Sequence, residues 1–271
     1  MKKIIMAVAI FVMGNWLYGQ GRAVIPLDGE WRLTYGPFGR SAPATPDELK
    51  TKGWPVIPAA VPGNVELDLL ASGKVKNPET GNHIYALRQY EAYQWWYSRS
   101  FATPRRTAGE RVEIVFEGLD CFGTIWVNNA LVGKTDNMLI SRRFDITDRL
   151  APAGENTVDV RIDPAVAEAQ KHINGSIGSR KFFRVEQEHT RKAPHMYGWD
   201  IMPRLVSAGL WRGVRLEISK PTRLEQVYWM TDDVDVARKK ANVLLDWQLA
   251  TDRLPLDGLT MEVSLASELS T

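Results

Sequence analysis

The most constraining feature of the sequence is a pair of neighbouring apolar stretches, RVEIVFEGL and GTIWVNNALVGKT. In the first stretch, Val112, Ile114 and Phe116 alternate with other residues, which is the period of a strand that buries one face. In the second, Asn128 and Asn129 separate two apolar runs. Asparagine tolerates the positive φ that a two-residue hairpin turn requires. The pair therefore predicts antiparallel strands joined by tight turns.

The same alternation recurs along most of the remaining sequence, so we predict an all-β fold. One short helix is expected in VPGNVELDLLASGKV, with Asn64 as its N-cap and Gly73 as its stop. A regular alternation of helices and strands, which would indicate an α/β fold, is absent from the sequence. Further strands are expected at residues 27–35, 94–102, 141–147, 156–163, 211–219, 223–231, 241–250 and 259–267.

The expected strands form two series, which predicts two β-domains. The first domain should span residues 21–220, and Pro221 begins the second series. Residues 221–271 hold about three strands, whereas an immunoglobulin-like sandwich has about seven. We therefore expect an incomplete immunoglobulin-like sandwich at residues 221–271.

The N-terminal segment MKKIIMAVAIFVMGNWLYGQ has the pattern of a secretory signal peptide. Lys2 and Lys3 precede an apolar run at residues 4–13, and this run is too short for a membrane span. We expect residues 1–20 to be removed and the protein to be exported, either to the periplasm or out of the cell. The alternative is a membrane anchor. We expect no membrane span in the mature chain.

Charge and cysteine content limit the classes of partner, metal and cofactor that we expect this chain to bind. The 34 Lys and Arg against 32 Asp and Glu give a net charge of +2, and basic residues form no block, so we expect no nucleic-acid partner. The single cysteine, Cys121, cannot form an internal disulfide, and we expect a buried, unreactive thiol. The sequence contains no Cys/His spacing typical of zinc and no calcium-loop motif, so we expect neither a metal nor a cofactor.

A long stretch without alternation, residues 164–204, leads into the segment APHMYGWDIMPRLVSAGLW at residues 193–211. A connection of this length inside a compact domain is usually functional or disordered. Trp199 is a candidate for ligand contact or for packing between domains. Asp200 is a candidate for ligand contact, for capping a turn or for pairing with Arg204. We expect Arg204 to form structural ion pairs.

The segment FEGLDCFGTIWVNNALVGKTDNMLISRRFDITDRL resembles the N-terminal sugar-binding domain of glycoside hydrolase family 2. The strand WWYSRSF is similar to the Trp-x-Tyr-x-Arg-x-Phe strand of the same family. The resemblance implies a jelly-roll β-sandwich like that of galactose-binding domains. The matching residues of the first segment are Phe116, Gly118, Leu119, Asp120, Val127, Asn128, Gly133, Asn137, Phe144, Asp145, Ile146 and Thr147.

Two further segments resemble the β-mannosidase branch of that family. VPGNVELDLLASG is similar to that branch's Val-Pro-Gly-x-Val-x-x-Asp-Leu-Leu motif, and the order Arg-Lys-Ala, Tyr-Gly-Trp-Asp, Pro-Arg and Gly-Leu-Trp-Arg follows its pattern. Ile201 and Met202 depart from it, where the branch has Trp and Gly, which leaves the identity of the sugar open. By this resemblance, Trp199 and Asp200 would contact the substrate at the −1 subsite.

The resemblance also implies that two catalytic glutamates lie on a separate (β/α)₈ barrel. The sequence contains neither the Asn-Glu dipeptide typical of the acid/base nor a βα repeat, so we expect the chain alone to be inactive. The parent protein would be an exported retaining exo-β-glycosidase, with an oligosaccharide substrate and its own C-terminal barrel as partners. A β-galactosidase or β-glucuronidase of the same family and a non-catalytic carbohydrate-binding module are the alternatives.

Overall fold

A computed structural model describes residues 22–173, 185–252 and 254–257, and the chain divides into two compact units. The larger unit comprises residues 24–105 and 112–217, and the smaller one includes residues 106–111 and the chain from Ile218 onward. The expected signal peptide at residues 1–20 and the expected strand at residues 259–267 lie outside the described residues. The two units are described separately below.

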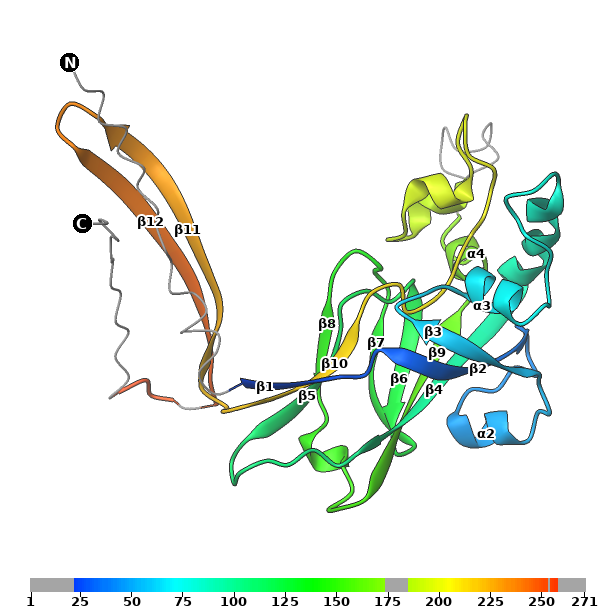
Figure 1. The fold of residues 1–271 in the computed structure, drawn as a ribbon, viewed down its shortest axis with the longest axis horizontal. Helices are drawn as coiled ribbons and strands as arrows, with labels where there is room; N and C mark the ends of the chain where they lie inside the picture. The colour runs from blue at the N-terminus through cyan, green and yellow to red at the C-terminus, as the bar shows by residue number, and fades with distance from the viewer. Residues whose placement is uncertain (1–21, 174–184, 253, 258–271) are drawn as a thin grey trace. The chain divides into compact units, whose positions relative to one another are not determined.

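Two β-sheets pack face to face around the core of the larger unit, which confirms the all-β prediction (Figure 1). The six-stranded sheet has the order β3 (Val56–Val61), β2 (Gly29–Pro37), β4 (Tyr93–Ala102), β9 (Glu155–Asp163), β6 (Phe122–Val127) and β7 (Ala130–Thr135). The four-stranded sheet has the order β1 (Arg22–Pro26), β10 (Val214–Ser219), β5 (Arg111–Phe116) and β8 (Arg142–Asp145).

The strands bury the faces that their sequences indicate. Trp31, Leu33 and Tyr35 of β2 are all buried. The hairpin between β6 and β7 turns at Asn128 and Asn129, whose φ angles are 50° and 63°, as the sequence predicts. Alternation and turn chemistry were therefore sufficient to locate these strands.

Two predicted strands begin later than expected. The strand expected at residues 27–35 begins at Gly29, and the strand expected at residues 211–219 begins at Val214, whose N–H donates to the Asp28 carboxylate at 2.8 Å. Trp211 lies before the strand, and its indole N–H donates to the carbonyl of Met138 at 3.0 Å. Trp211 therefore holds a loop against the sandwich.

The predicted helix is present as α3 (Val65–Ala71). The Asn64 side chain caps it by accepting the Leu67 N–H at 3.0 Å, and Gly73 follows with a φ of +66°. The other helical elements are short connections between strands. These are α2 (Pro46–Lys50), η1 (His83–Ala92), η2 (Thr147–Arg149), α4 (Ala165–Gln170), η4 (Val185–His189) and η5 (Pro194–Tyr197).

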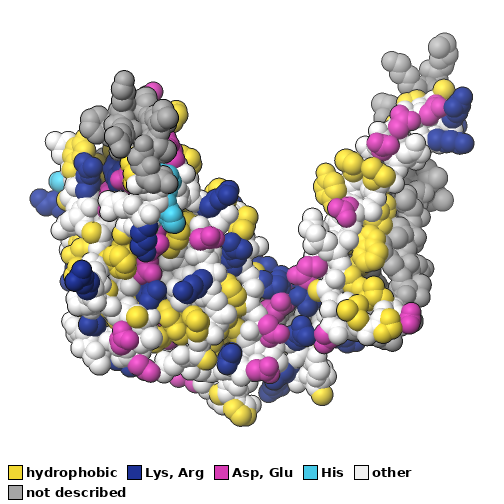
Figure 2. Space-filling view, turned by 180° about the vertical axis from the view of Figure 1, so that it is seen from behind, with side chains coloured by type: hydrophobic (Ala, Val, Ile, Leu, Met, Phe, Trp, Pro, Cys, Tyr) yellow, Lys and Arg dark blue, Asp and Glu magenta, His cyan; other side chains and the backbone are white. Residues whose placement is uncertain are grey.

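The smaller unit contains an antiparallel hairpin of β11 (Arg223–Asp235) and β12 (Lys240–Ala250). Both strands lie where the sequence predicts them. Several large apolar side chains of the hairpin are exposed, among them Tyr228, Leu244 and Trp247, and Figure 2 shows hydrophobic side chains gathered over it. Exposed apolar faces of this kind typically mark surfaces that other elements cover. Within the described part of the chain, no helix has the length and apolar character needed to cross a membrane.

Candidate functional site

The candidate segment at residues 193–211 carries a tight turn at its outer end. After η5, the Trp199 N–H donates to the Met202 carbonyl at 2.8 Å, and the Met202 N–H donates back to the Trp199 carbonyl at 3.2 Å. Asp200 and Ile201 occupy the tip, where Ile201 is 88% exposed. The turn therefore presents its side chains to the outside of the sandwich.

The two predicted contact residues lie together on this turn. Asp200 is exposed, and Trp199 is 55% exposed. Arg204 does not pair with Asp200, which was one of the alternatives for Asp200. Arg204 instead binds both carboxylate oxygens of Glu91: its Nε donates to Oε1 at 2.9 Å, and its Nη2 donates to Oε2 at 2.7 Å. The structure thus exposes both the Asp200 side chain and that of its neighbour in the chain, Trp199, and a carboxylate and an indole suit contact with a polar ligand that has apolar faces.

Arg204 fulfils the structural role expected for it. Besides Glu91, it forms an ion pair with Glu186 at 3.3 Å, and its guanidinium lies 5.6 Å from the centre of the Tyr197 ring. These contacts connect the segment to η1, which is distant in the sequence, and to η4, which shortly precedes the segment. Arg204 therefore stabilises the C-terminal side of the exposed turn.

Buried charges lie beneath the segment, and sequence reasoning missed their role. Lys192 is fully buried and forms an ion pair with Asp120, and it donates to the Ser207 carbonyl at 2.7 Å. The Ser207 hydroxyl donates to Glu66 of α3 at 2.6 Å. The only sequence signal for this group was the presence of Asp120 and Lys192 in family-like motifs.

Burial perturbs the acidic groups around this ion pair. Desolvation raises the pKa of Glu66 and that of Asp120 above their ordinary values. Asp68, also on α3, accepts the Ala60 N–H at 2.9 Å, and burial raises the pKa of Asp68 to about 6. Residues two apart on a helix do not face each other, so the spacing of Glu66 and Asp68 does not indicate a catalytic pair of carboxylates.

A mainly apolar cavity of about 480 Å³ lies between the candidate segment, the start of α3 and the loop after β7. It adjoins the buried ion pair, since Asp120 and Ser207 both contribute to its wall. Its full lining is Pro62, Gly63, Asn64, Asp120, Met138, Leu139, Ala193, His195, Met196, Ser207, Ala208 and Trp211.

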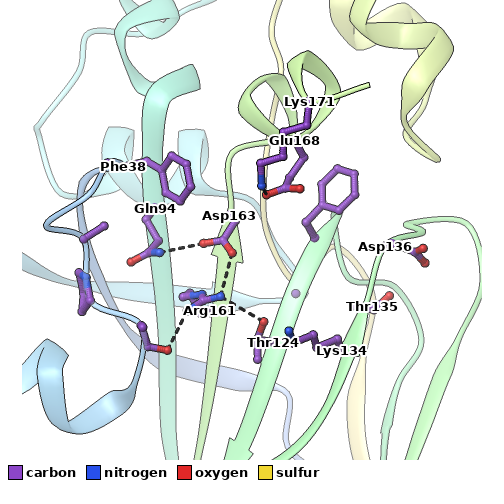
Figure 3. A pocket seen from close by; sticks show the side chains of 16 residues that line it. Phe38, Gln94, Thr124, Lys134, Thr135, Asp136, Arg161, Asp163, Glu168 and Lys171 are labelled. Carbon is purple, nitrogen blue, oxygen red and sulfur yellow. Dashed lines mark hydrogen bonds and ion pairs between the residues drawn. The ribbon is translucent and has the colours of Figure 1, made fainter. Parts of the chain in front are cut away.

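A larger cavity of about 680 Å³ lies at one end of the six-stranded sheet, and Figure 3 shows Arg161 and Asp163 at its centre. The polar groups of its floor bind one another. Arg161 pairs with Asp163 at 3.0 Å and donates to the Ala44 carbonyl at 2.7 Å, while Gln94 donates to Asp163 at 2.8 Å. This network attaches the loop before α2 to the sheet, so we assign it a structural role.

Two other expectations concern metals and the cysteine. Among the described residues, no group of three or more metal-ligating side chains is found. Cys121 is buried, as predicted, and its thiol donates to the Asp136 carbonyl at 3.2 Å. Burial raises the pKa of Cys121 to about 12, which disfavours the reactive thiolate.

Comparison with known proteins gives a consistent result. Residues 41–212 match the sequence model of the glycosyl hydrolase 2 galactose-binding domain-like family. A β-mannosidase B from Aspergillus niger is 32% identical over 204 residues, which is 73% of this chain and 23% of that protein. A β-mannosidase B from Thermothelomyces thermophilus is 34% identical over 226 residues, which is 82% of this chain and 25% of that protein. The chain thus spans about a quarter of the length of these relatives.

Solved structures agree with the fold. The crystal structure of a β-D-mannosidase from Dictyoglomus thermophilum matches with a TM-score of 0.70 and 26% identity, over 84% of this chain and 26% of that chain. A β-glucuronidase from Bifidobacterium dentium matches with a TM-score of 0.53 and 23% identity, over 86% of this chain and 37% of that chain. The second likeness concerns the fold alone.

Proposed function

Because the chain belongs to the glycosyl hydrolase 2 galactose-binding domain-like family, we propose that it forms the front part of a β-mannosidase-like glycoside hydrolase. In this proposal the enzyme removes β-linked sugars from the non-reducing ends of oligosaccharides, and this chain contributes contacts to the sugar. One observation carries the proposal: the turn at residues 199–202 presents the indole of Trp199 and the carboxylate of Asp200 together on an exposed tip.

The chemistry of the two side chains suits a terminal pyranose. An ionised carboxylate accepts hydrogen bonds from two sugar hydroxyls, and such charge-assisted bonds are about twice as strong as neutral ones. An indole ring covers the apolar face of a pyranose, and its N–H donates to a hydroxyl. Contacts away from the reacting bond also hold the reactive geometry, so they affect the rate as well as binding.

The catalytic groups belong to another part of the proposed enzyme. A retaining glycosidase uses two carboxyl groups about 5–5.5 Å apart, one as acid/base and one as nucleophile. We propose that a barrel domain supplies both and that residues 1–20 direct export of the protein. N-terminal sequencing of the mature protein tests the export step, since it should begin near residue 21.

The comparisons favour a β-mannosidase over the other activities considered. The curated relatives above carry the name β-mannosidase B, and the β-mannosidase structure has the higher TM-score of the two solved structures described. A β-galactosidase or β-glucuronidase remains the alternative within the family, because Ile201 and Met202 depart from the β-mannosidase pattern. A non-catalytic carbohydrate-binding module is the alternative outside the enzymes.

The proposal is tested by Asp200→Ala in the full-length protein. Because hydrogen bonds to charged groups contribute about 1.5–3 kcal/mol, kcat/KM for an aryl β-mannoside should fall about 10- to 100-fold. Asp148→Ala is the matched control, since Asp148 is an exposed aspartate in the same unit. An unchanged kcat/KM in Asp200→Ala contradicts the role of Asp200. A wild-type protein that hydrolyses aryl β-galactoside or β-glucuronide but not β-mannoside contradicts the proposed substrate.

A further inference from the structure

We propose that Lys192 is a positioning residue, which fixes both ends of residues 193–206, the part of the candidate segment that carries Trp199 and Asp200, and thereby sets where these two side chains lie. This inference rests on the proposed function, because it assumes that the turn contacts the sugar. Lys192 directly precedes the segment, and Ser207 follows the turn 15 residues further along the chain. A single ammonium group joins these two positions.

The side chain of Lys192 is enclosed entirely by protein. Its side chain is 0% exposed and that of its ion-pair partner Asp120 is 3% exposed. Asp120 lies in the connection between β5 and β6, so the ion pair attaches the start of the segment to the sandwich. The same ammonium donates to the Ser207 carbonyl at 2.7 Å, which attaches the end of the segment to its start.

Neighbouring contacts hold the same end of the segment. The Ser207 hydroxyl donates to Glu66 at 2.6 Å. The Asp120 N–H donates to the Gly209 carbonyl at 2.9 Å, and the Val65 N–H donates to the Ala208 carbonyl at 3.0 Å. The end of the segment is therefore bound both to α3 and to the connection that carries Asp120.

The outer turn has a different kind of support. The backbone hydrogen bonds of Trp199 and Met202 run between these two residues, within the turn itself. The stem of the turn is closed by the Leu205 N–H, which donates to the Met196 carbonyl at 2.9 Å, and Arg204 holds its C-terminal side. The position of the tip therefore depends on these contacts together with the place where the two ends of the segment are held. A displacement of about 1 Å at a contact residue can cost a factor of about 100 in rate, so fixing the ends matters for catalysis.

A buried ion pair is better explained by such a geometric role than by stability. Replacing a buried ion pair by apolar residues of similar volume is often neutral or stabilising, because desolvation offsets much of the attraction. By contrast, an ammonium group that donates both to Asp120 and to the Ser207 carbonyl fixes the positions of these two acceptors, which an apolar side chain would not do. Removing Lys192 alone leaves the Asp120 carboxylate buried and unpaired, so the test also uses a variant that removes this charge.

The experiment is a double-mutant cycle in the full-length protein. Lys192→Met should lower kcat/KM for an aryl β-mannoside at least about tenfold. In an Asp200→Ala background the same change should lower kcat/KM by a smaller factor, because the part of the effect that acts through the position of Asp200 is already lost, and two changes that act through one backbone shift are not additive. Lys192→Met combined with Asp120→Asn removes both charges. We expect this variant to unfold cooperatively while its kcat/KM stays low. Equal effects of Lys192→Met in both backgrounds would overturn the proposal.

Hydrogen exchange of the backbone amides provides a readout that does not depend on activity. In both Lys192 variants, exchange at residues 193–206 should rise at least about fivefold, because the segment opens locally when its ends are released. Arg143→Met is the control: Arg143 pairs with Glu113 and Glu217 within the larger unit, so its loss should leave exchange in the segment unchanged.

The two measurements separate the possible failures. Unchanged exchange at residues 193–206 in the Lys192 variants overturns the proposal, whatever the activity. If Asp200→Ala has no effect on kcat/KM, the proposed sugar contact of Asp200 is wrong. If Lys192→Met then also retains full kcat/KM, the positioning role of Lys192 is wrong as well. If Asp200→Ala lowers kcat/KM and Lys192→Met does not, only the positioning role fails.

Discussion

Replacing Asp68 by asparagine should stabilise the larger unit at neutral pH and weaken the pH dependence of its stability between about pH 4 and pH 6. Asp68 lies on α3 and is 4% exposed. One carboxylate oxygen accepts the Ala60 N–H at 2.9 Å, and the other accepts the Tyr97 hydroxyl at 3.4 Å. Burial is the dominant influence and raises the pKa of Asp68 from 3.8 to about 6.

The sign and size of the effect follow from this pKa. The folded state binds the Asp68 proton more tightly than the unfolded state does, so the contribution to stability is complete below about pH 4 and is lost as pH rises through about 6. A difference of about 2 pH units corresponds to at most about 3 kcal/mol. An asparagine side chain has nearly the same shape as that of aspartate, its carbonyl oxygen can accept the Ala60 N–H, and it carries no charge. Asp68→Asn should therefore be about 1–3 kcal/mol more stable at pH 7 and close to wild type at pH 4.

Urea unfolding followed by tryptophan fluorescence at several pH values measures this difference. Glu66 and Asp120 also have raised pKa values, so the wild-type curve contains their contributions, and the difference between wild type and Asp68→Asn isolates that of Asp68. Asp148→Asn, at an exposed site, is the control and should follow the wild type. If the wild-type and Asp68→Asn curves stay parallel from pH 4 to pH 7, the argument from burial is wrong.

Two further predictions concern the sandwich itself. Cys121 should react with a thiol reagent at neutral pH only after urea unfolds the protein, because its thiol is buried and its pKa is about 12; rapid reaction of the folded protein would contradict this. Asn129→Val should lower the unfolding free energy by about 1–3 kcal/mol, since a β-branched residue is strained at a φ of 63°, whereas Asn129→Gly should be neutral or stabilising. Urea unfolding of both variants measures this, and equal stabilities would rule out the assigned turn.

The exposed turn was only partly predictable from sequence. The mixture of rings, charge and glycine at residues 193–211 indicated a functional connection, and a family resemblance singled out Trp199 and Asp200. The resemblance carried no information on the partners of Arg204. Glu91, its main partner, lies 113 residues away in the chain, a separation that no local pattern spans.

The sequence by itself determined the local elements: the Asn128-Asn129 turn, the Asn64 cap of α3 and the buried face of β2. Each depends on residues a few positions apart, whose backbone preferences and periodicity act before any tertiary contact forms. Only the tertiary structure decided that Lys192 meets Asp120, 72 residues away, and that α3 turns Asp68 into the protein. The reason is physical: ion pairing and pKa shifts depend on which charges are brought together and removed from water, and this is fixed only when the sheets close.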